Sequence, residues 1–374
     1  MMLWRAGIPA LFCCLSLTVR AAEDETALLP VRAEGYADGI GFAARRNAIQ
    51  AAARDAVAQF AQSLLSGEDL AALEVLNEAT PRYVDHVDVF RQEERGNTTY
   101  VEADVYLLER ALQRDLAEFM LPRFGAPPRV ILVIGEQFVQ DDVPAVLEGG
   151  VAETVLIEAL AKKGIAAQGV GAVPGHFTHP DLLGAVQGDI ETSGLFVRAL
   201  NADVIVLGTA VARAAATAAG SNLLRNEAAL TLRVFRAFDG KMTETLSARH
   251  VVHAADPREG GKQALRDASL KLAPDVGVAA VITVLGARAE EGIRLTIEHP
   301  GDRARLEELL RTLQAIPGAS QFEELFYSSL LARFAFVYDG PMALLVDQVR
   351  GRKFGDAKLT IQSVIGREMH VAFP

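Results

Sequence analysis

The amino-acid sequence predicts an α+β and α/β protein made of three small mixed sheet-and-helix modules in tandem after a signal peptide. Short runs in which apolar and polar residues alternate are typical of strands, and they are interspersed with longer segments of helical periodicity. The stretch Pro122–Pro128 opposes both helix and central strand and predicts a domain boundary. The 374 residues are 50% hydrophobic and 23% charged, which indicates a globular chain of two or three domains.

The amino terminus has the layout of a secretory signal peptide over residues 1–21. Met1–Arg5 carries one positive charge, Ile8–Leu17 is apolar, and Val19-Arg20-Ala21 offers modest residues to a signal peptidase. The apolar run is too short to cross a bilayer, which takes about 20 residues. A buried amino-terminal helix is the rival interpretation. We expect cleavage of the leader and a mature chain in the periplasm. Association of the mature chain with the outer membrane stays open.

Both cysteines of the chain, Cys13 and Cys14, lie inside this leader. Lipid attached to either would tether the chain, but Phe12 stands before Cys13, where bacterial lipoproteins carry a small residue. Cleavage near Ala21 is the expected outcome, and lipid anchoring stays an alternative. A cleaved chain contains no cysteine, which excludes disulfides, thiolate metal sites and a cysteine nucleophile.

The charge of the chain limits its partners. The sequence has 37 Lys+Arg against 48 Asp+Glu, a formal net charge of −11. An acidic surface repels phosphate backbones and anionic lipid, so we expect no nucleic-acid partner and no charge-driven membrane contact. We also expect no segment after the leader that is long and apolar enough to cross a membrane.

The first module, residues 31–121, is predicted as β-α-β-β-α. Apolar residues at helical spacing from Ile49 to Leu64 predict a long helix, which Ser66-Gly67 ends. Strict alternation over Thr99–Leu108 predicts a half-buried strand, and Gly96-Asn97 predicts a hairpin turn before it. The predicted elements are the strand Val31–Ala37, the long helix, the strands Tyr83–Gln92 and Thr99–Leu108, and the helix Leu108–Leu121.

The second module, residues 129–275, is predicted as an α/β unit whose sheet is parallel on one side and ends in an antiparallel hairpin. Val130–Ile134 is a continuous apolar run, which suits a strand covered on both faces. Gly171–Asp189 is rich in Gly, Pro and His and is interpreted as a loop, and Asp239-Gly240 predicts a tight turn. The other predicted elements are the helices Val151–Lys163, Thr192–Leu200 and Gly261–Leu272 and the strands Ile165–Val170, Ala202–Leu207, Ala228–Phe238 and Met242–His253.

The third module, residues 278–374, is predicted as a β-β-α-β-β-α-β-β docking unit. Leucines on one face of Asp302–Ala315 predict an amphipathic helix, which Pro317-Gly318 ends. The other predicted elements are the strands Ala280–Ala287, Gly292–His299, Ser320–Tyr327, Leu331–Tyr338, Leu359–Ile365 and Glu368–Phe373 and the helix Pro341–Arg350.

Two pairs of histidines have spacings that suggest metal binding. His176 and His179 lie three apart in the predicted loop, where zinc would need a third ligand such as Asp181 or Asp189. Solvated loop histidines are the commoner explanation of such spacing. His250 and His253 lie three apart in a predicted strand, so they project to opposite faces and do not share an ion.

Two glycine-rich turns suggest phosphate cradles but lack the residues that complete one. Gly39-Ile40-Gly41 and Gly149-Gly150 each precede a predicted helix, without the third glycine of a dinucleotide site or the lysine of a P-loop. No nucleophile elbow or zinc-protease motif is present. We therefore predict no catalytic residue, no cofactor-binding residue and no metal ligand, hence a protein that is not an enzyme.

The predicted hairpins and sheet edges suit docking of other proteins by strand addition or surface contact. In an oligomer, acidic faces need basic counterparts, for which Arg45-Arg46 and Arg350–Lys353 are candidates. For each of them a solvated charge cluster is the plainer interpretation.

The first two modules resemble a known family. Glu34-Gly35-Tyr36-Ala37, followed by the alanine-rich stretch Ala43–Val57, resembles the amino-terminal domain of flagellar assembly protein T and is similar to small lipoproteins of flagellar basal discs. Arg129–Gly135, Ala202–Gly208 and the Asp239-Gly240 hairpin resemble that protein's middle domain, itself similar to the TolB amino-terminal domain and the curli secretion channel protein. The likeness covers about residues 31–275. The third module departs from the family, whose carboxy-terminal domain is expected to be a small β-barrel.

The resemblance implies a non-enzymatic structural or assembly subunit of a cell-envelope complex, such as a periplasmic ring around the flagellar basal body. Its implied partners are envelope proteins and further copies of itself. Two alternatives stay open. One is an accessory protein that regulates an outer-membrane secretion channel or enzyme, and the other is a metal- or ligand-binding periplasmic protein that uses the loop Gly171–Asp189.

Overall fold

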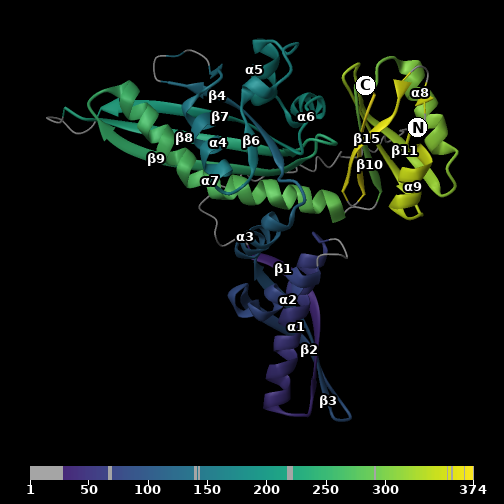
Figure 1. The fold of residues 1–374 in the computed structure, drawn as a ribbon. Coiled ribbons are helices and arrows are strands. Elements are labelled where there is room, and N and C mark those ends of the chain that lie inside the picture. Colours follow the sequence, from purple (N-terminus) through teal and green to yellow (C-terminus); the bar gives the residue numbers. More distant parts are fainter. Residues whose placement is uncertain are drawn as a thin grey trace, which may run out of the picture.

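The computed structural model describes residues 28–65, 70–138, 141, 144–216, 222–289, 292–351, 353–354, 357–365 and 367–373. The predicted leader, with Cys13 and Cys14, lies outside these residues. Mixed sheets and helices follow one another along the described chain, which confirms the predicted fold class (Figure 1).

The first module is a three-stranded antiparallel sheet with helices beside it, in the strand order β1-β3-β2. Its elements are β1 (Leu28–Asp38), α1 (Phe42–Gln62), α2 (Leu70–Glu78), the 3-10 turn η1 (Thr80–Arg82), β2 (Val84–Arg95), β3 (Thr98–Leu108), α3 (Glu109–Met120) and the 3-10 turn η2 (Leu121–Arg123). Alternate residues of β3 are buried, as its sequence predicts. The helix α2 corrects the predicted order, which has no element between the long helix and the hairpin.

The helix α1 lies unusually close to β1, and Gly35 makes this possible. A Cβ atom at Gly35 would lie 1.9 Å from the carbonyl oxygen of Ala48 and 2.5 Å from the amide nitrogen of Ala52. Ala48, Ala52 and Ala56 are all fully buried. The glycine in the strand and the small residues of the helix are therefore two halves of one packing arrangement.

The second module contains a sheet with the strand order β5-β4-β7-β8-β9, in which β6 also pairs with β4. Its elements are β4 (Arg129–Gln137), β5 (Ala145–Val146), α4 (Val151–Lys162), β6 (Ala166–Gln168), η3 (Val170–Ala172), α5 (His179–Gln187), α6 (Ile190–Arg198), β7 (Val204–Ala216), β8 (Leu224–Arg236), β9 (Met242–Ala254) and α7 (Pro257–Ala289). β4 is parallel to β6 and β7, whereas β7, β8 and β9 are antiparallel, as predicted. The stretch Gly171–Asp189 is not a plain loop, because it contains α5.

The helix α7 is longer than the sequence predicts. It runs through Pro274 as one helix, so the predicted helix end at Leu272 and the predicted strand Ala280–Ala287 are both wrong. Residues 278–285 are rich in valine and alanine, a composition that strands share, but they pack in helical form against α4 and the sheet. The third module therefore lacks its predicted first strand.

By length and composition alone, Pro257–Ala287 qualifies as a membrane span, contrary to our expectation for the segments after the leader. Within the fold, 61% of its most apolar window is buried. It packs against β7, β8, β9 and α4, so its apolar side serves as core.

The third module is a sheet with the strand order β11-β12-β10-β16-β15 and two helices. Its elements are β10 (Ile293–Glu298), α8 (Arg303–Gln314), β11 (Ala319–Tyr327), β12 (Leu331–Tyr338), α9 (Met342–Val349), β13 (Lys353–Phe354), β14 (Ala357–Lys358), β15 (Thr360–Ile365) and β16 (Glu368–Ala372). Leucines of α8 and α9 and phenylalanines of β12 form one apolar core. The opposite face of this sheet carries buried polar side chains, among them Arg294, Thr296 and Arg333.

The modules are joined in two different ways. The first meets the second through α3, whose apolar residues share a core cluster with α4 and α7 and whose Arg110 pairs with Glu244 of β9. The third meets the second through polar contacts, in which Asn201 donates to Glu298 over 2.7 Å. Figure 1 shows the first module projecting away from the other two, with α3 at the junction.

Candidate functional site

His176 and His179 do not belong to a set of side chains that could bind a metal ion in the described part of the chain. His176 lies against the ring of Phe177 at 4.3 Å between centroids, and His179 is the first residue of α5. Among the described residues, no group of three or more histidine, cysteine or acidic side chains is placed to hold a metal ion.

The two acidic residues considered as further ligands begin helices instead. Asp181 accepts hydrogen bonds from the backbone N–H and the hydroxyl of Thr178, both at 2.7 Å, which forms a capping box at α5. Asp189 accepts from the backbone N–H of Thr192 at 2.7 Å and caps α6. These bonds hold the pKa of both carboxyls below its usual value. Their carboxylates therefore have a structural role.

The strand histidines lie on opposite faces of β9, as their spacing predicts. His250 faces α7, where its Nε2 lies 3.5 Å from Asp267, and His253 is exposed. The basic candidates are also placed at the surface, since Arg45 and Arg46 are exposed on α1. Arg350 and Lys353 are exposed as well, and Arg352 lies outside the described residues.

The turn Gly39-Ile40-Gly41 connects β1 to α1 and lies beside the turn of the β2–β3 hairpin. Both glycines have positive φ angles, 94° and 87°. The N–H of Gly39 donates to the carbonyl of Asn97 at 2.6 Å, and the hydroxyl of Thr99 donates to the carbonyl of Gly39 at 2.8 Å. The glycines therefore serve the geometry of the turn.

The turn Gly149-Gly150 does not offer a free phosphate cradle, because the protein's own carboxylate fills that place. Glu136, at the end of β4, accepts a hydrogen bond from the N–H of Ala152 in the first turn of α4 at 2.6 Å. A Cβ atom on Gly150 would lie 2.6 Å from Oε1 of Glu136. Glu153 is also buried and accepts from the N–H of Val170 at 3.2 Å. Two buried carboxylates thus tie β4, α4 and the segment after β6 together.

Burial raises the pKa of Glu136 above its usual value, although backbone hydrogen bonds at α4 lower it in part. A carboxyl with a raised pKa binds more protons in the folded than in the unfolded state, so its contribution to stability falls as pH rises through that pKa. Relative to Glu136→Gln, the wild-type protein should gain unfolding free energy as the pH falls from 7.5 to 5. Chemical unfolding at a series of pH values measures this difference.

Asp181→Asn is the control for this experiment, because the lowered pKa of Asp181 places its titration below the chosen range. Its difference from the wild type should stay constant between pH 7.5 and 5. A Glu136→Gln difference that is equally constant would show that Glu136 does not take up a proton on folding.

An open hollow lies on the first module, between α1, α2 and β2. Its volume is about 880 Å³, and it is open to solvent. A smaller, mainly apolar hollow of about 170 Å³ lies between α3, α4 and α7. The larger one, which we name the α1–α2 groove, is lined by Ile49, Gln50, Ala53, Arg54, Leu73, Glu74, Asn77, Glu78, Thr80, Pro81, Val84 and Val87.

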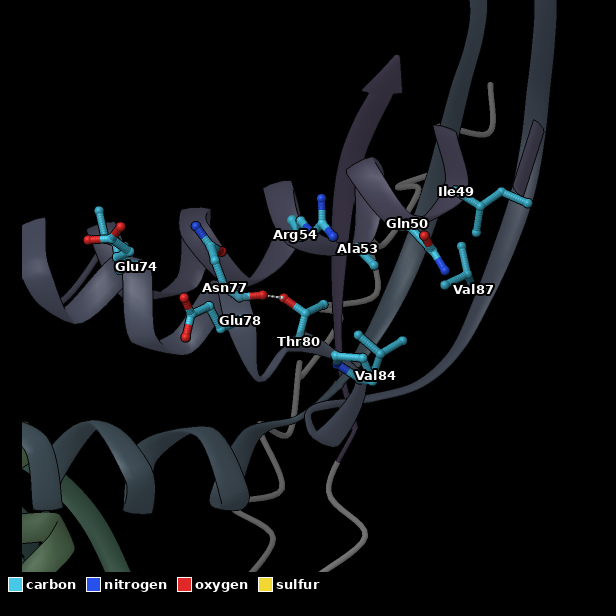
Figure 2. A pocket seen from close by; sticks show the side chains of 12 residues that line it. Ile49, Gln50, Ala53, Arg54, Glu74, Asn77, Glu78, Thr80, Val84 and Val87 are labelled. Atoms are coloured by element: carbon cyan, nitrogen blue, oxygen red, sulfur yellow. Dashed lines mark hydrogen bonds between the residues drawn. The ribbon is translucent and has the colours of Figure 1, made fainter. Parts of the chain in front are cut away.

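The α1–α2 groove has an apolar floor and two charged rims. Aliphatic side chains from α1, α2 and β2 form the floor. Arg54 stands on the α1 rim, and Glu74 and Glu78 stand on the α2 rim, all three exposed. Figure 2 shows Arg54 with Ala53, Gln50 and Ile49 along α1, and Glu74 and Glu78 across from them on α2.

The groove exists because one helix covers two of the three strands. α1 packs mainly on β1 and β3 and only slightly on β2. The inward side chains of β2, among them Val84 and Val87, are consequently only half-buried. The short helix α2 stands beside this uncovered strip, and the hydroxyl of Thr80 donates to the carbonyl of Asn77 at 2.8 Å to end it.

Sequence reasoning missed this site because it missed α2. Leu70, Leu73 and Leu76 repeat every third residue, which is a helical signal over a short length. The candidates that the sequence did suggest all carry histidine, glycine or arginine at recognisable spacings. The groove instead depends on the distance between α1 and α2 in the fold. The spacing of residues in the sequence does not predict this distance.

Comparison with known proteins finds only solved structures of low similarity to this chain. No protein-family model and no curated protein matches the chain. Among solved structures, a dodecamer of a PelC variant from Paraburkholderia phytofirmans is 15% identical with a TM-score of 0.24, over 40% of this chain and 88% of that one. Lipoprotein GNA1162 from Neisseria meningitidis is 13% identical with a TM-score of 0.22, over 39% of this chain and 96% of that one.

These similarities are too low to carry an argument about activity or partners. The fold itself defines a mixed α+β protein of tandem modules with a groove on its projecting module. The resemblance to flagellar assembly protein T stays a prediction.

Proposed function

We propose that the chain is a non-enzymatic structural or assembly protein of the bacterial cell envelope, exported to the periplasm, whose first module docks a protein partner. One observation carries this proposal: an open groove of about 880 Å³ lies on the module that projects from the rest of the molecule. The predicted leader supports the location.

The lining of the groove favours protein docking over chemistry. Its floor is aliphatic, and its charged residues, Arg54, Glu74 and Glu78, stand on the rims and are exposed. Catalytic side chains usually lie close together and partly buried within a cleft. Protein–protein interfaces instead combine an apolar centre with a polar rim. The second and third modules then act as the body that holds the docking module in place.

The finer form of the proposal is a subunit of a ring near the flagellar basal body. The order of the first two modules supports it, through the resemblance of residues 31–275 to flagellar assembly protein T. Loss of motility in a deletion strain that keeps its other envelope functions is the result expected of this form. A fully motile deletion strain contradicts the flagellar form alone.

Native mass spectrometry of periplasmic and envelope extracts tests the broader proposal. We expect the cleaved chain in complexes with envelope proteins or further copies of itself. Gln50→Trp, which places a large ring on the groove rim, should lower the occupancy of the complex. Gln263→Trp, at an equally exposed glutamine on α7, should not. A wild-type chain found only as a free monomer contradicts the proposal.

A further inference from the structure

We infer that the α1–α2 groove receives an amphipathic α-helix of a partner protein, with an apolar stripe on the groove floor, acidic side chains toward α1 and basic side chains toward α2. This inference rests on the proposed docking function and specifies the chemistry of the partner. Four observations support it: the size of the groove, the character of the β2 edge, the charges on the rims and a buried acceptor without a donor.

The dimensions of the groove suit one further helix. Adjacent strands lie about 4.8 Å apart and packed helices about 8–10 Å apart, so one helix covers roughly two strands. α1 covers β1 and β3, which leaves β2, a strand at the edge of the sheet, largely without a helix over it. The inward half of a four-turn helix of about 10 Å diameter occupies about 850 Å³. The groove measures about 880 Å³.

The free edge of β2 does not suit the alternative, an added strand. The strand is interrupted by register shifts between Val84 and His86 and between Val89 and Arg91. Most of its side chains are exposed, and seven of its twelve residues are charged or titratable. Bulges and charges of this kind protect edges from pairing with other strands. The partner therefore reaches this module through the groove between the helices.

The rims select the charges of the partner. Arg54 lines the groove on α1, and the exposed Arg46 lies two turns before it, one turn beyond the lining residue Gln50. Neither arginine forms a salt bridge within the described residues. Glu74 and Glu78 lie one turn apart on α2 and are likewise without a cation there. Two opposite, unpaired charge rows beside an apolar floor are complementary to a helix with one acidic and one basic flank.

A buried acceptor lies at the same place. The side-chain Oδ1 of Asn77, a residue that lines the groove, is buried and accepts no hydrogen bond within the described part of the chain. A buried polar atom without a partner costs free energy, and native proteins rarely leave one unsatisfied. Because this oxygen has no contact with solvent, the basic flank of the incoming helix, which lies toward α2, supplies a donor to it once the Asn77 side chain turns toward the groove.

Three synthetic peptides of about 18 residues, or five turns, test the inference with the full-length mature protein. All carry the same leucine stripe at helical spacing. The mixed peptide has glutamate on one flank and lysine on the other, the second peptide has glutamate on both flanks, and the third has lysine on both. Fluorescence anisotropy with labelled peptides measures the Kd of each. A fourth peptide, the mixed sequence with a central proline, tests whether the bound form is helical.

The mixed peptide should bind about tenfold more tightly than either uniform peptide, because only it places favourable charges on both rims. The proline peptide should lose most of this affinity, whereas an extended ligand would keep it. In the double variant Arg46→Glu with Arg54→Glu both rims are acidic, so the lysine peptide should become the tightest ligand. Arg266→Glu, at an exposed arginine of α7, should leave the order unchanged.

Equal binding of the three peptides, an order that the double variant does not change, or no binding below about 1 mM would overturn the inference. Full affinity of the proline peptide would replace the helix by an extended ligand and overturn it as well. None of these results alters the native mass spectrum of envelope extracts, so failure of the helix inference is separable from failure of the proposed function.

Discussion

Gly35→Ala is expected to lower the stability of the first module by more than about 3 kcal/mol, a large share of the stability of a small domain. The new Cβ would meet the backbone of α1, at 1.9 Å from the carbonyl oxygen of Ala48. A flexible side chain could turn away, but this neighbour is helix backbone that is bonded into its own turn. The helix must move off the sheet, and the buried contacts of Ala52 and Ala56 are then lost.

Chemical unfolding followed by far-UV circular dichroism measures this effect, with limited proteolysis to show which module has opened. Gly184→Ala is the matched control, because the new methyl group meets no atom within 4 Å and alanine favours the helix α5. It should leave the stability unchanged or raise it slightly. If Gly35→Ala unfolds at the same denaturant concentration as the wild type, α1 does not lie this close to β1.

The same close approach determines the position of the groove. Gly35 allows α1 to settle over β1 and β3, and the strip over β2 is uncovered as a result. A Gly35→Ala protein that stays folded with α1 displaced should therefore also bind the mixed peptide less tightly. The close packing at Gly35 and the position of the α1–α2 groove therefore depend on each other.

Local signals in the sequence predicted most elements of the first two modules. The alternation in Thr99–Leu108 and the turn at Gly96-Asn97 predicted the hairpin, because period-two burial and a glycine turn are visible in adjacent residues. The continuous apolar run Val130–Ile134 predicted a strand covered on both faces, and β4 is buried on both faces.

The errors concern segments in which tertiary packing overrides local composition. Ala280–Ala287, rich in valine and alanine, was predicted as a strand, yet it belongs to α7, which packs against α4 and the sheet, and Pro274 does not end this helix. The short helix α2 was missed because its nine residues carry few periodic positions. The α1–α2 groove was missed with it, and no catalytic or metal motif pointed to that part of the chain.

The contact between the second and third modules also could not be predicted from local sequence patterns. Arg333 looks like one surface cation among many in the sequence, but only 2% of it is exposed. It lies in a row with Thr296 and His370 across three strands of the third module, on the face toward the second. Its burial comes from contact with Ala237 of the second module, which is 96 residues away in the sequence. No pattern in neighbouring residues indicates such a contact.

Arg333→Met is expected to weaken the joint between the second and third modules by about 2 kcal/mol of interface free energy, enough to release the third module first. The guanidinium donates to the carbonyl oxygens of Ala237 and Leu200, the latter at 2.7 Å. Burial lowers the pKa of Arg333 to about 10, so the group is still charged at neutral pH. Methionine fills a similar volume but donates nothing, so the buried carbonyl of Ala237 loses its donor, at a cost of about 1–3 kcal/mol. The carbonyl of Leu200 still accepts from the backbone N–H of Ala202 at 3.0 Å. Removal of a buried charge offsets part of this cost.

Chemical unfolding and limited proteolysis distinguish release from general damage. In the wild type we expect the second and third modules to unfold together, whereas in Arg333→Met the third module should unfold first and be cleaved first. Arg311→Met, at an exposed arginine on α8 of the same module, should leave both measurements unchanged. If Arg333→Met unfolds like the wild type, the carbonyls are satisfied without it and the joint depends on other contacts, such as the bond from Asn201 to Glu298.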